Sequence, residues 1–171
     1  MPQRILIGNI ISLSSSVFLF WGSITARRER VYLFGIFECT LLFIAQLFFG
    51  QGAAAVSLLI AAFRNFLLWL GKYTRSFSAL IFILTLILGL LFNTGGALGL
   101  LPLIATLTLT VTSYYAKTYV KLKLSLFLNL SLWSIFSILI FDVSSSVINL
   151  TSAFLTVVSL LKYRKDEKSK A

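Results

Sequence analysis

Hydrophobic residues run along the chain in seven blocks of about 16 to 20 residues, separated by short polar or glycine-containing breaks. A helix needs about 20 mostly apolar residues to cross the hydrocarbon core of a bilayer, and somewhat shorter stretches are tolerated. The pattern therefore predicts an all-α polytopic membrane protein with seven transmembrane helices. The predicted spans are residues 5–24, 31–49, 53–70, 77–92, 97–116, 124–141 and 143–161.

The composition excludes a water-soluble fold. Of the 171 residues, 58% are hydrophobic and only 12% are charged, whereas a soluble domain has about half apolar and roughly a quarter charged residues. Too few polar side chains are present to cover a compact soluble surface. The first block is too long for the apolar part of a cleavable signal peptide, so we expect it to remain as a span.

The positive charge is distributed so that it predicts an orientation. Of the 15 Lys and Arg residues, 13 fall in the breaks after spans one, three, five and seven. Because cytoplasmic loops carry an excess of Lys and Arg, the N-terminus is predicted outside and the C-terminus in the cytoplasm. The net charge of +10 then reflects topology, and no nucleic-acid partner is expected. The 13 residues are Arg27, Arg28, Arg30, Lys72, Arg75, Lys117, Lys121, Lys123, Lys162, Arg164, Lys165, Lys168 and Lys170.

A shift of the chain by 92 residues overlays spans one to three on spans five to seven, with Gly50 falling on Asp142. This overlay predicts a 3+1+3 parallel repeat, the arrangement of SWEET transporters. The predicted units are a first three-helix unit at 1–76, a linker helix at 77–96, a second three-helix unit at 97–162 and a cytoplasmic basic tail at 163–171.

Two full charges, Glu38 and Arg64, lie inside predicted spans two and three. Each is seven residues from the cytoplasmic end of its span, so both lie roughly 10 Å below the same interface at 1.5 Å per residue. A lone charge there is costly, and the matching depths predict an ion pair, with Asn65 capping it. Two interpretations stay open: a packing clasp between two helices, and a cytoplasmic gate or substrate contact.

Milder polar residues form stripes along single helical faces. The predicted solute-binding residues are Asn129 and Trp133 in span six, Asn149 in span seven and Ser57 in span three. The amides would hydrogen-bond to hydroxyl groups of the solute, and the indole face would stack on a ring. Serine and threonine stripes also serve helix packing, and that alternative stays open. Pro102 in span five is either a hinge or the mark of a helix start.

No catalytic or metal-binding set is present. The chain has no histidine and a single cysteine, Cys39, which excludes an intramolecular disulfide and a thiolate metal cluster. Paired carboxylates and phosphate-binding loops are missing as well. We therefore expect no enzyme activity, no metal and no cofactor.

Four short stretches resemble one known family. They are Phe-Gly-Gln-Gly-Ala-Ala at 49–54, Ala-Ala-Phe-Arg-Asn at 61–65, Leu-Pro-Leu-Ile-Ala-Thr at 101–106 and Leu-Trp at 132–133. Their order and spacing resemble the YgjV-type family of bacterial inner-membrane proteins over roughly residues 10 to 165. That resemblance implies a relation to PQ-loop and SWEET-like transporters, although Pro102 is followed by Leu103 and not by the glutamine of a PQ-loop. It implies fold and location more than a substrate.

These observations predict a transporter or facilitator of a small polar solute, sugar-like or vitamin-like, in the bacterial inner membrane. Two three-helix bundles would rock around a site near the middle of the bilayer. With Glu38 neutralised by Arg64, facilitated diffusion is expected over proton coupling. The alternative is a non-transporting accessory or scaffold protein. Membrane lipids are the other expected partners, and the oligomeric state stays open.

Overall fold

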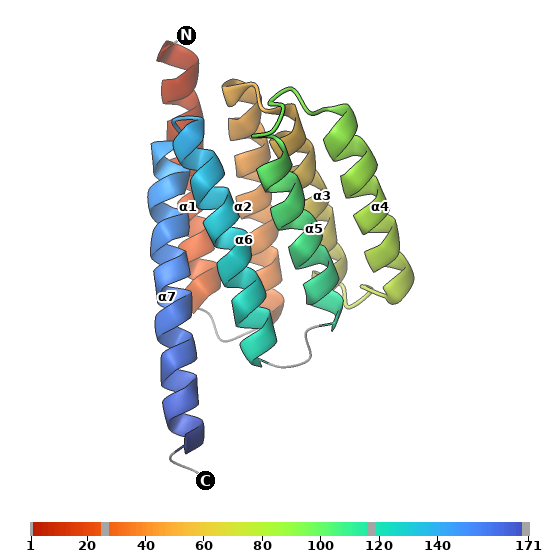
Figure 1. The fold of residues 1–171 in the computed structure, drawn as a ribbon, viewed down its shortest axis with the longest axis vertical. Coiled ribbons are helices and arrows are strands. Elements are labelled where there is room, and N and C mark those ends of the chain that lie inside the picture. Colours follow the sequence, from red (N-terminus) through yellow and green to blue (C-terminus); the bar gives the residue numbers. More distant parts are fainter. Residues whose placement is uncertain (1, 25–27, 116–118, 169–171) are drawn as a thin grey trace.

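Seven α-helices make up almost all of the part of the chain that the computed structural model describes, which is residues 2–24, 28–115 and 119–168 (Figure 1). No strand occurs among these residues, so the all-helical prediction is confirmed. The helices are α1 (Pro2–Ile24), α2 (Arg28–Phe49), α3 (Gly52–Trp69), α4 (Arg75–Leu91), α5 (Leu100–Tyr115), α6 (Tyr119–Leu139) and α7 (Val143–Lys168).

The helices run side by side along the long axis of the molecule and alternate in direction, so α1 begins at one end and α7 finishes at the other (Figure 1). Three of them, α1, α2 and α3, are long and apolar enough to cross a membrane, and the other four contain shorter apolar helical stretches. Large hydrophobic side chains are exposed along every helix. A surface of this kind is suited to lipid and not to water.

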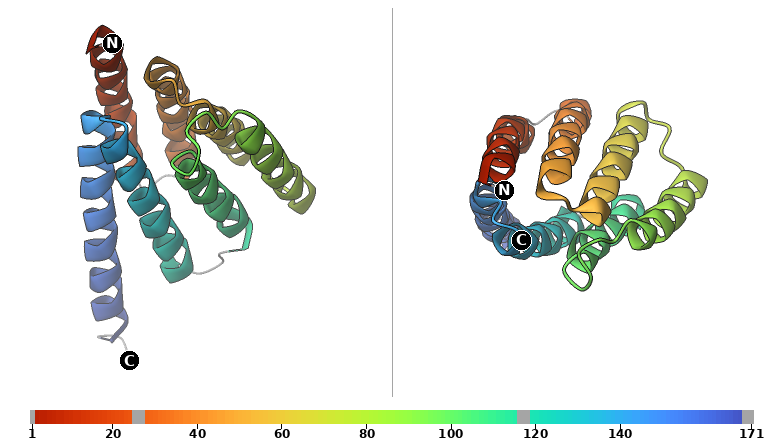
Figure 2. Two further views of the ribbon diagram at one scale, coloured as in Figure 1. Left: turned by 45° about the horizontal axis from the view of Figure 1, so that its top comes forward. Right: turned by 90° about the horizontal axis from the view of Figure 1, so that it is seen from above.

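Seen from above, the helices form two rows (Figure 2). One row is α1–α2–α3 and the other is α7–α6–α5, while α4 packs beside α3 and α5 at one edge. The rows meet where α1 contacts α7 and where α3 contacts α5. Within the described residues α1 makes no backbone contact with α3, and α5 makes none with α7. The three helices of each expected unit therefore lie in a row, in which each helix packs on its neighbours in sequence.

The turn between α2 and α3 has the same backbone hydrogen bonds as the turn between α6 and α7, 91 residues later. Gln51 N–H donates to the Gln46 carbonyl at 3.0 Å, and Asp142 N–H donates to the Ser137 carbonyl at 2.9 Å. Gly50 and Phe141 have the positive φ values of these turns, 71° and 62°. Both are Schellman motifs, in which a left-handed residue ends the helix.

The structural match between the two turns therefore lies at 91 residues, one fewer than the 92 of the sequence overlay. The overlay placed Gly50 on Asp142, but the backbone equates Gly50 with Phe141. The helix starts that follow the two turns agree with this offset, since α3 begins at Gly52 and α7 at Val143.

Basic residues gather at the end of the molecule where α7 finishes, which we call the basic end. Arg30 and Lys121 lie in the first turns of α2 and α6, and Lys72 and Arg75 lie between α3 and α4. Of the 13 predicted cytoplasmic residues, Arg27, Lys117 and Lys170 lie outside the described part of the chain. The predicted tail at 163–171 continues as α7 up to Lys168.

Candidate functional site

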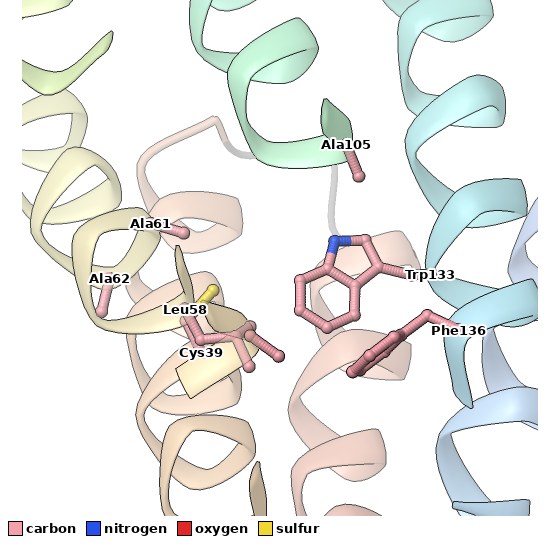
Figure 3. Close-up of a cluster of buried hydrophobic side chains, with 8 residues drawn as sticks. Cys39, Leu58, Ala61, Ala62, Ala105, Trp133 and Phe136 are labelled. Carbon is pink, nitrogen blue, oxygen red and sulfur yellow. The ribbon is translucent and has the colours of Figure 1, made fainter. Parts of the chain in front are cut away.

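An apolar cluster lies between the two rows (Figure 3). It joins α2, α3, α5 and α6, and its members are Cys39, Ala54, Leu58, Ala61, Ala62, Ala105, Trp133 and Phe136. Trp133 is 9% exposed and meets Phe136 edge to face, with ring centroids 5.7 Å apart. The indole ring is therefore packed against neighbours, in place of the expected position beside an open cavity. Its contact with a solute stays a prediction.

Arg64 lies five residues before the end of α3 at the basic end, and only 5% of its surface is exposed. Its Nη1 donates to Thr110 Oγ1 of α5 at 3.4 Å, and its Nη2 donates to Asn65 Oδ1 at 3.5 Å. Both distances are long for hydrogen bonds to a charged group. The Nε atom has no hydrogen-bond partner. A buried guanidinium is thus held by two weak bonds to neutral oxygens.

The predicted ion pair between Arg64 and Glu38 is not formed. Among the described residues, the hydrogen bonds of the guanidinium go to Thr110 and Asn65 and not to Glu38, and no basic group lies within salt-bridge distance of that half-buried carboxylate.

The reason lies in the helical geometry. Consecutive helix residues point about 100° apart, and here it is Asn65 that faces α2, where its Nδ2 lies 3.7 Å from Cys39 Sγ. Asn65 also covers Gly35, because a Cβ atom built there would lie 2.7 Å from Asn65 Nδ2. Arg64 consequently points toward α5. Equal depth of two residues on neighbouring helices therefore does not by itself bring their side chains into contact.

Asn129 of α6 is 9% exposed, and none of the described residues is hydrogen-bonded to its side-chain amide. By the 91-residue match of the turns it is the counterpart of Glu38 of α2, just as Trp133 is the counterpart of Leu42. Asn129 and Trp133 are four residues apart and therefore share one helical face. Glu38 and Leu42 have the same relation on α2. The two halves thus carry a polar residue at matching positions. Asn129 lies one turn toward the basic end from Trp133, and Glu38 is next to Cys39 of the apolar cluster.

Ser57 and Asn149 were predicted to face each other across a pseudo-two-fold axis. Ser57 is fully buried, and its Oγ has no hydrogen-bond partner. Asn149 is half-buried, and the 91-residue match equates it with Leu58 and not with Ser57. The one-residue error of the overlay therefore separates this pair, and their joint role in solute binding stays a prediction.

A polar network near the end opposite the basic end was missed by the sequence analysis. Asp142 is fully buried between α6 and α7, where it accepts hydrogen bonds from Ser12 Oγ at 2.9 Å and from the Ser145 N–H at 3.0 Å. Burial raises the pKa of Asp142, and these two hydrogen bonds partly oppose that rise. An Asp just before the start of a helix is a typical N-cap. This signal could have identified the role of Asp142.

The side-chain oxygens of Gln46 and Ser137 are also buried without hydrogen-bond partners. These residues occupy matching positions in the two Schellman turns. Together with Ser57 they place unpaired polar atoms in the half of the molecule opposite the basic end. Ser57 and Ser137 are next to Leu58 and Phe136 of the apolar cluster, whereas Gln46 lies beyond the cluster, toward the end opposite the basic end.

Pro102 is buried in the first turn of α5, which begins at Leu100. A proline in the first helical turn removes no intrahelical hydrogen bond. This position favours the interpretation of Pro102 as the mark of a helix start over that of a hinge.

Two shallow apolar grooves lie on the outside of the molecule. One, of about 340 Å³, runs between α4 and α5, and the other, of about 230 Å³, between α6 and α7. None of the predicted solute-binding residues lines either groove. Within the described residues, no three Cys, Asp or Glu side chains lie close enough together to hold a metal ion.

The fold and its apolar surface place this chain in a membrane, and a comparison with protein families agrees. Residues 6–167 match the model of the YgjV family, described as bacterial inner membrane protein. The chain belongs to this family. The resemblance seen in the sequence is thereby confirmed, and with it the bacterial inner membrane as the location. No curated protein and no solved structure matches the chain, so similarity to SWEET or PQ-loop proteins stays a prediction.

Proposed function

We propose that this YgjV family member is a multi-pass transporter or facilitator that moves a small polar solute across the inner membrane by alternating access. The observation that carries the proposal is the buried guanidinium of Arg64, whose Nε has no hydrogen-bond partner. Charged groups inside a membrane protein are costly and typically mark a substrate or ion pathway. The amide of Asn129, to which none of the described residues is hydrogen-bonded, lies in the same half of the molecule and supports this interpretation.

The arrangement of the helices supports crossing by all seven, in a 3+1+3 plan. The equivalent turns after α2 and α6 are expected of two units in the same orientation, with α4 as the linker. Parallel repeats of this kind bind their solute near the bilayer midplane at the repeat interface. The units would move as rows, and the contacts of α1 with α7 and of α3 with α5 would change during transport.

Polar residues flank the apolar cluster along two helices: Asn129 lies one turn toward the basic end from Trp133 on α6, and Gln46 lies about two turns toward the other end from Cys39 on α2. In this proposal the cluster is the barrier that a solute passes when the rows move. Gathering of basic residues at the end where α7 finishes supports a cytoplasmic basic end, since cytoplasmic loops are rich in Lys and Arg. Facilitated diffusion is not favoured over proton coupling, because Arg64 does not neutralise Glu38 by direct contact.

The rival function is a non-transporting accessory or scaffold protein. The close packing of Trp133 favours it, since a scaffold needs a filled interior and no solute pathway. No enzymatic reaction is part of either proposal.

Reconstitution into proteoliposomes tests the choice. Uptake or counterflow of labelled metabolites above that of protein-free liposomes is expected for a transporter. A protein that is folded and inserted, yet moves no member of a broad metabolite panel, would be a scaffold.

A further inference from the structure

Two opposite charges lie well inside the helices without pairing with each other. Arg64 on α3 bonds to Thr110 and Asn65, and the carboxylate of Glu38 on α2 has none of the described basic groups within salt-bridge distance. The residues next to them, Cys39 and Asn65, are in contact across α2 and α3, with Asn65 Nδ2 3.7 Å from Cys39 Sγ, so Glu38 and Arg64 lie at the same level of the molecule. A buried charge without a partner of opposite sign is costly, so both groups are available to pair with charges on a bound molecule.

The hydrogen-bonding capacity of Arg64 is largely unused. A guanidinium has five N–H donors in a fixed fork that fits a carboxylate with two parallel bonds. Here the Nε edge has no partner, and the Thr110 hydroxyl, which accepts from Nη1, itself donates to the Thr106 carbonyl at 2.8 Å. Neutral oxygens therefore hold the side chain in place and leave an edge of the guanidinium for an anionic group.

The surroundings of Glu38 require a second group of opposite charge. A simple anion bound at Arg64 would be repelled by the Glu38 carboxylate, and a neutral sugar would leave both charges without partners. A solute that carries one carboxylate and one ammonium group would satisfy both, and would cross the membrane without net charge. Asn129, the counterpart of Glu38 on α6, offers an amide to the polar remainder of such a molecule.

We infer that the solute of this protein is a zwitterion, whose carboxylate binds the Nε edge of Arg64 and whose ammonium group binds Glu38. This inference rests on the proposed transport function and narrows its solute class. It makes Arg64 and Glu38 the two residues that select the solute, each for one of its charges.

The experiment is counterflow into proteoliposomes that contain the full chain, with four isotopically labelled mixtures measured by mass spectrometry. The mixtures are amino acids, monocarboxylic acids, primary amines and neutral sugars. We expect uptake of at least one amino acid at about tenfold or more the rate of any acid, amine or sugar. The variants Glu38→Gln and Arg64→Gln should each lose this uptake, and Arg64→Lys should lose most of it, because a lysine lacks the fork.

Matched controls come from the same two residue types at exposed positions. Glu29→Gln and Arg4→Gln remove charges from exposed side chains near the ends of helices, and both should transport as the unaltered protein does. A thermal-unfolding assay supplies a second readout: the amino-acid mixture should raise the Tm of the unaltered protein and not that of Glu38→Gln. This pattern keeps the test decisive even if Arg64→Gln does not fold, because the solute preference is read on the unaltered chain.

Each other result overturns the inference. Preferential uptake of sugars, acids or amines would refute a zwitterion while leaving transport itself established. Zwitterion uptake that survives in folded Glu38→Gln and Arg64→Gln proteins would refute the assigned residues. No uptake from any mixture by folded, inserted protein would contradict the transport function, and the solute class would fail with it.

Discussion

The hydroxyl of Ser12 donates a 2.9 Å hydrogen bond to the Oδ2 atom of Asp142, which joins the first helix to the turn between the last two. The same region contains a second link, since Asn9 Nδ2 donates to the Phe141 carbonyl at 3.1 Å. The two bonds connect residues that are 130 and 132 positions apart in the chain. They close the ring of helices at the end opposite the basic end.

Replacing Asp142 should weaken the connection between the first helix and the turn before the last one. Asp142→Ala takes away the cap of α7, which is worth about 1 kcal/mol, and leaves the buried Ser12 hydroxyl without its acceptor, at a cost of about 1–3 kcal/mol. A lower free energy of unfolding is expected in mild detergent. In a cycle with Ser12→Ala the two changes should couple by at least about 0.5 kcal/mol.

Ser14→Ala is the matched control for Ser12→Ala, because Ser14 is exposed and bonds only to the Ile10 carbonyl of its own helix. It should change stability little. Additive effects of Ser12→Ala and Asp142→Ala would show that the hydrogen bond between these residues contributes nothing measurable.

Stability should depend on pH through Asp142. Burial raises its pKa above the ordinary value of 3.8, so the folded protein binds this proton more tightly than the unfolded chain does. The contribution of Asp142 to stability is therefore greatest below its ordinary pKa and is lost as the pH rises through the raised value. Acidification from neutral pH should stabilise the unaltered protein relative to Asp142→Asn.

The measurement is the Tm of both proteins between about pH 7 and pH 4. Other titrating groups are common to the two proteins, so the difference between their curves isolates Asp142. Parallel curves, or an unaltered protein that loses stability relative to Asp142→Asn on acidification, would show that the carboxyl group is not the origin of the effect.

The contact of Gly52 with the end of α4 should tolerate no side chain. A Cβ atom at Gly52 would collide with the backbone carbonyl oxygen of Phe92, which cannot rotate away as a side chain can. Gly52→Ala should therefore lower the Tm. Gly22→Ala is the control, because its Cβ would lie 3.6 Å from Phe34 Cβ, an ordinary contact, and alanine favours the helix. Equal Tm values for the two variants would contradict the close approach of α3 to the α4 end.

Much of the fold could be predicted from hydrophobic blocks, because each span is a single continuous apolar run whose limits are marked by charge or glycine. The expected limits at residues 53 and 143 agree with helix starts at Gly52 and Val143. The alignment of the two halves was harder to predict, because few residues are identical and the overlay placed Gly50 on Asp142. The positive φ angles of Gly50 and Phe141 and the matching hydrogen bonds of the two turns fix the offset at 91.

The side-chain contacts were less predictable for a related reason. Sequence spacing gives the depth of Arg64 but not whether Arg64 or Asn65 faces α2, a difference of one residue that moves the charge toward Thr110. Tryptophan in mid-span has the same ambiguity, since an indole can line a cavity or fill a core. In both cases the deciding information is the orientation of a helix about its axis.

The topology can be tested with reporters. A reporter fused after Ala171 should be cytoplasmic, and one inserted near Gly95 should be external, because the described basic residues gather at the end where α7 finishes. Cysteine labelling of intact cells gives the same information at single positions. Termini found on the same side of the membrane would contradict a seven-span chain.

The packing of Trp133 leads to the last prediction. Its ring is 9% exposed and contacts Phe136 edge to face within a cluster that joins four helices. Truncating a large aromatic side chain in such a site costs on the order of 3 kcal/mol, so Trp133→Ala should lower the Tm strongly. Trp133→Phe keeps an aromatic ring against Phe136 and should lose much less.

Ile135→Ala is the control on the same helix, because Ile135 is 49% exposed and faces away from the cluster. Its effect on the Tm should be small. Uptake per folded molecule then separates two roles of Trp133. If the indole also contacts the solute, Trp133→Phe should transport poorly while remaining folded, whereas a purely packing role leaves its uptake near normal. A Trp133→Ala protein as stable as the unaltered one would show instead that the ring borders open space and that the cluster is not the barrier between the two polar regions.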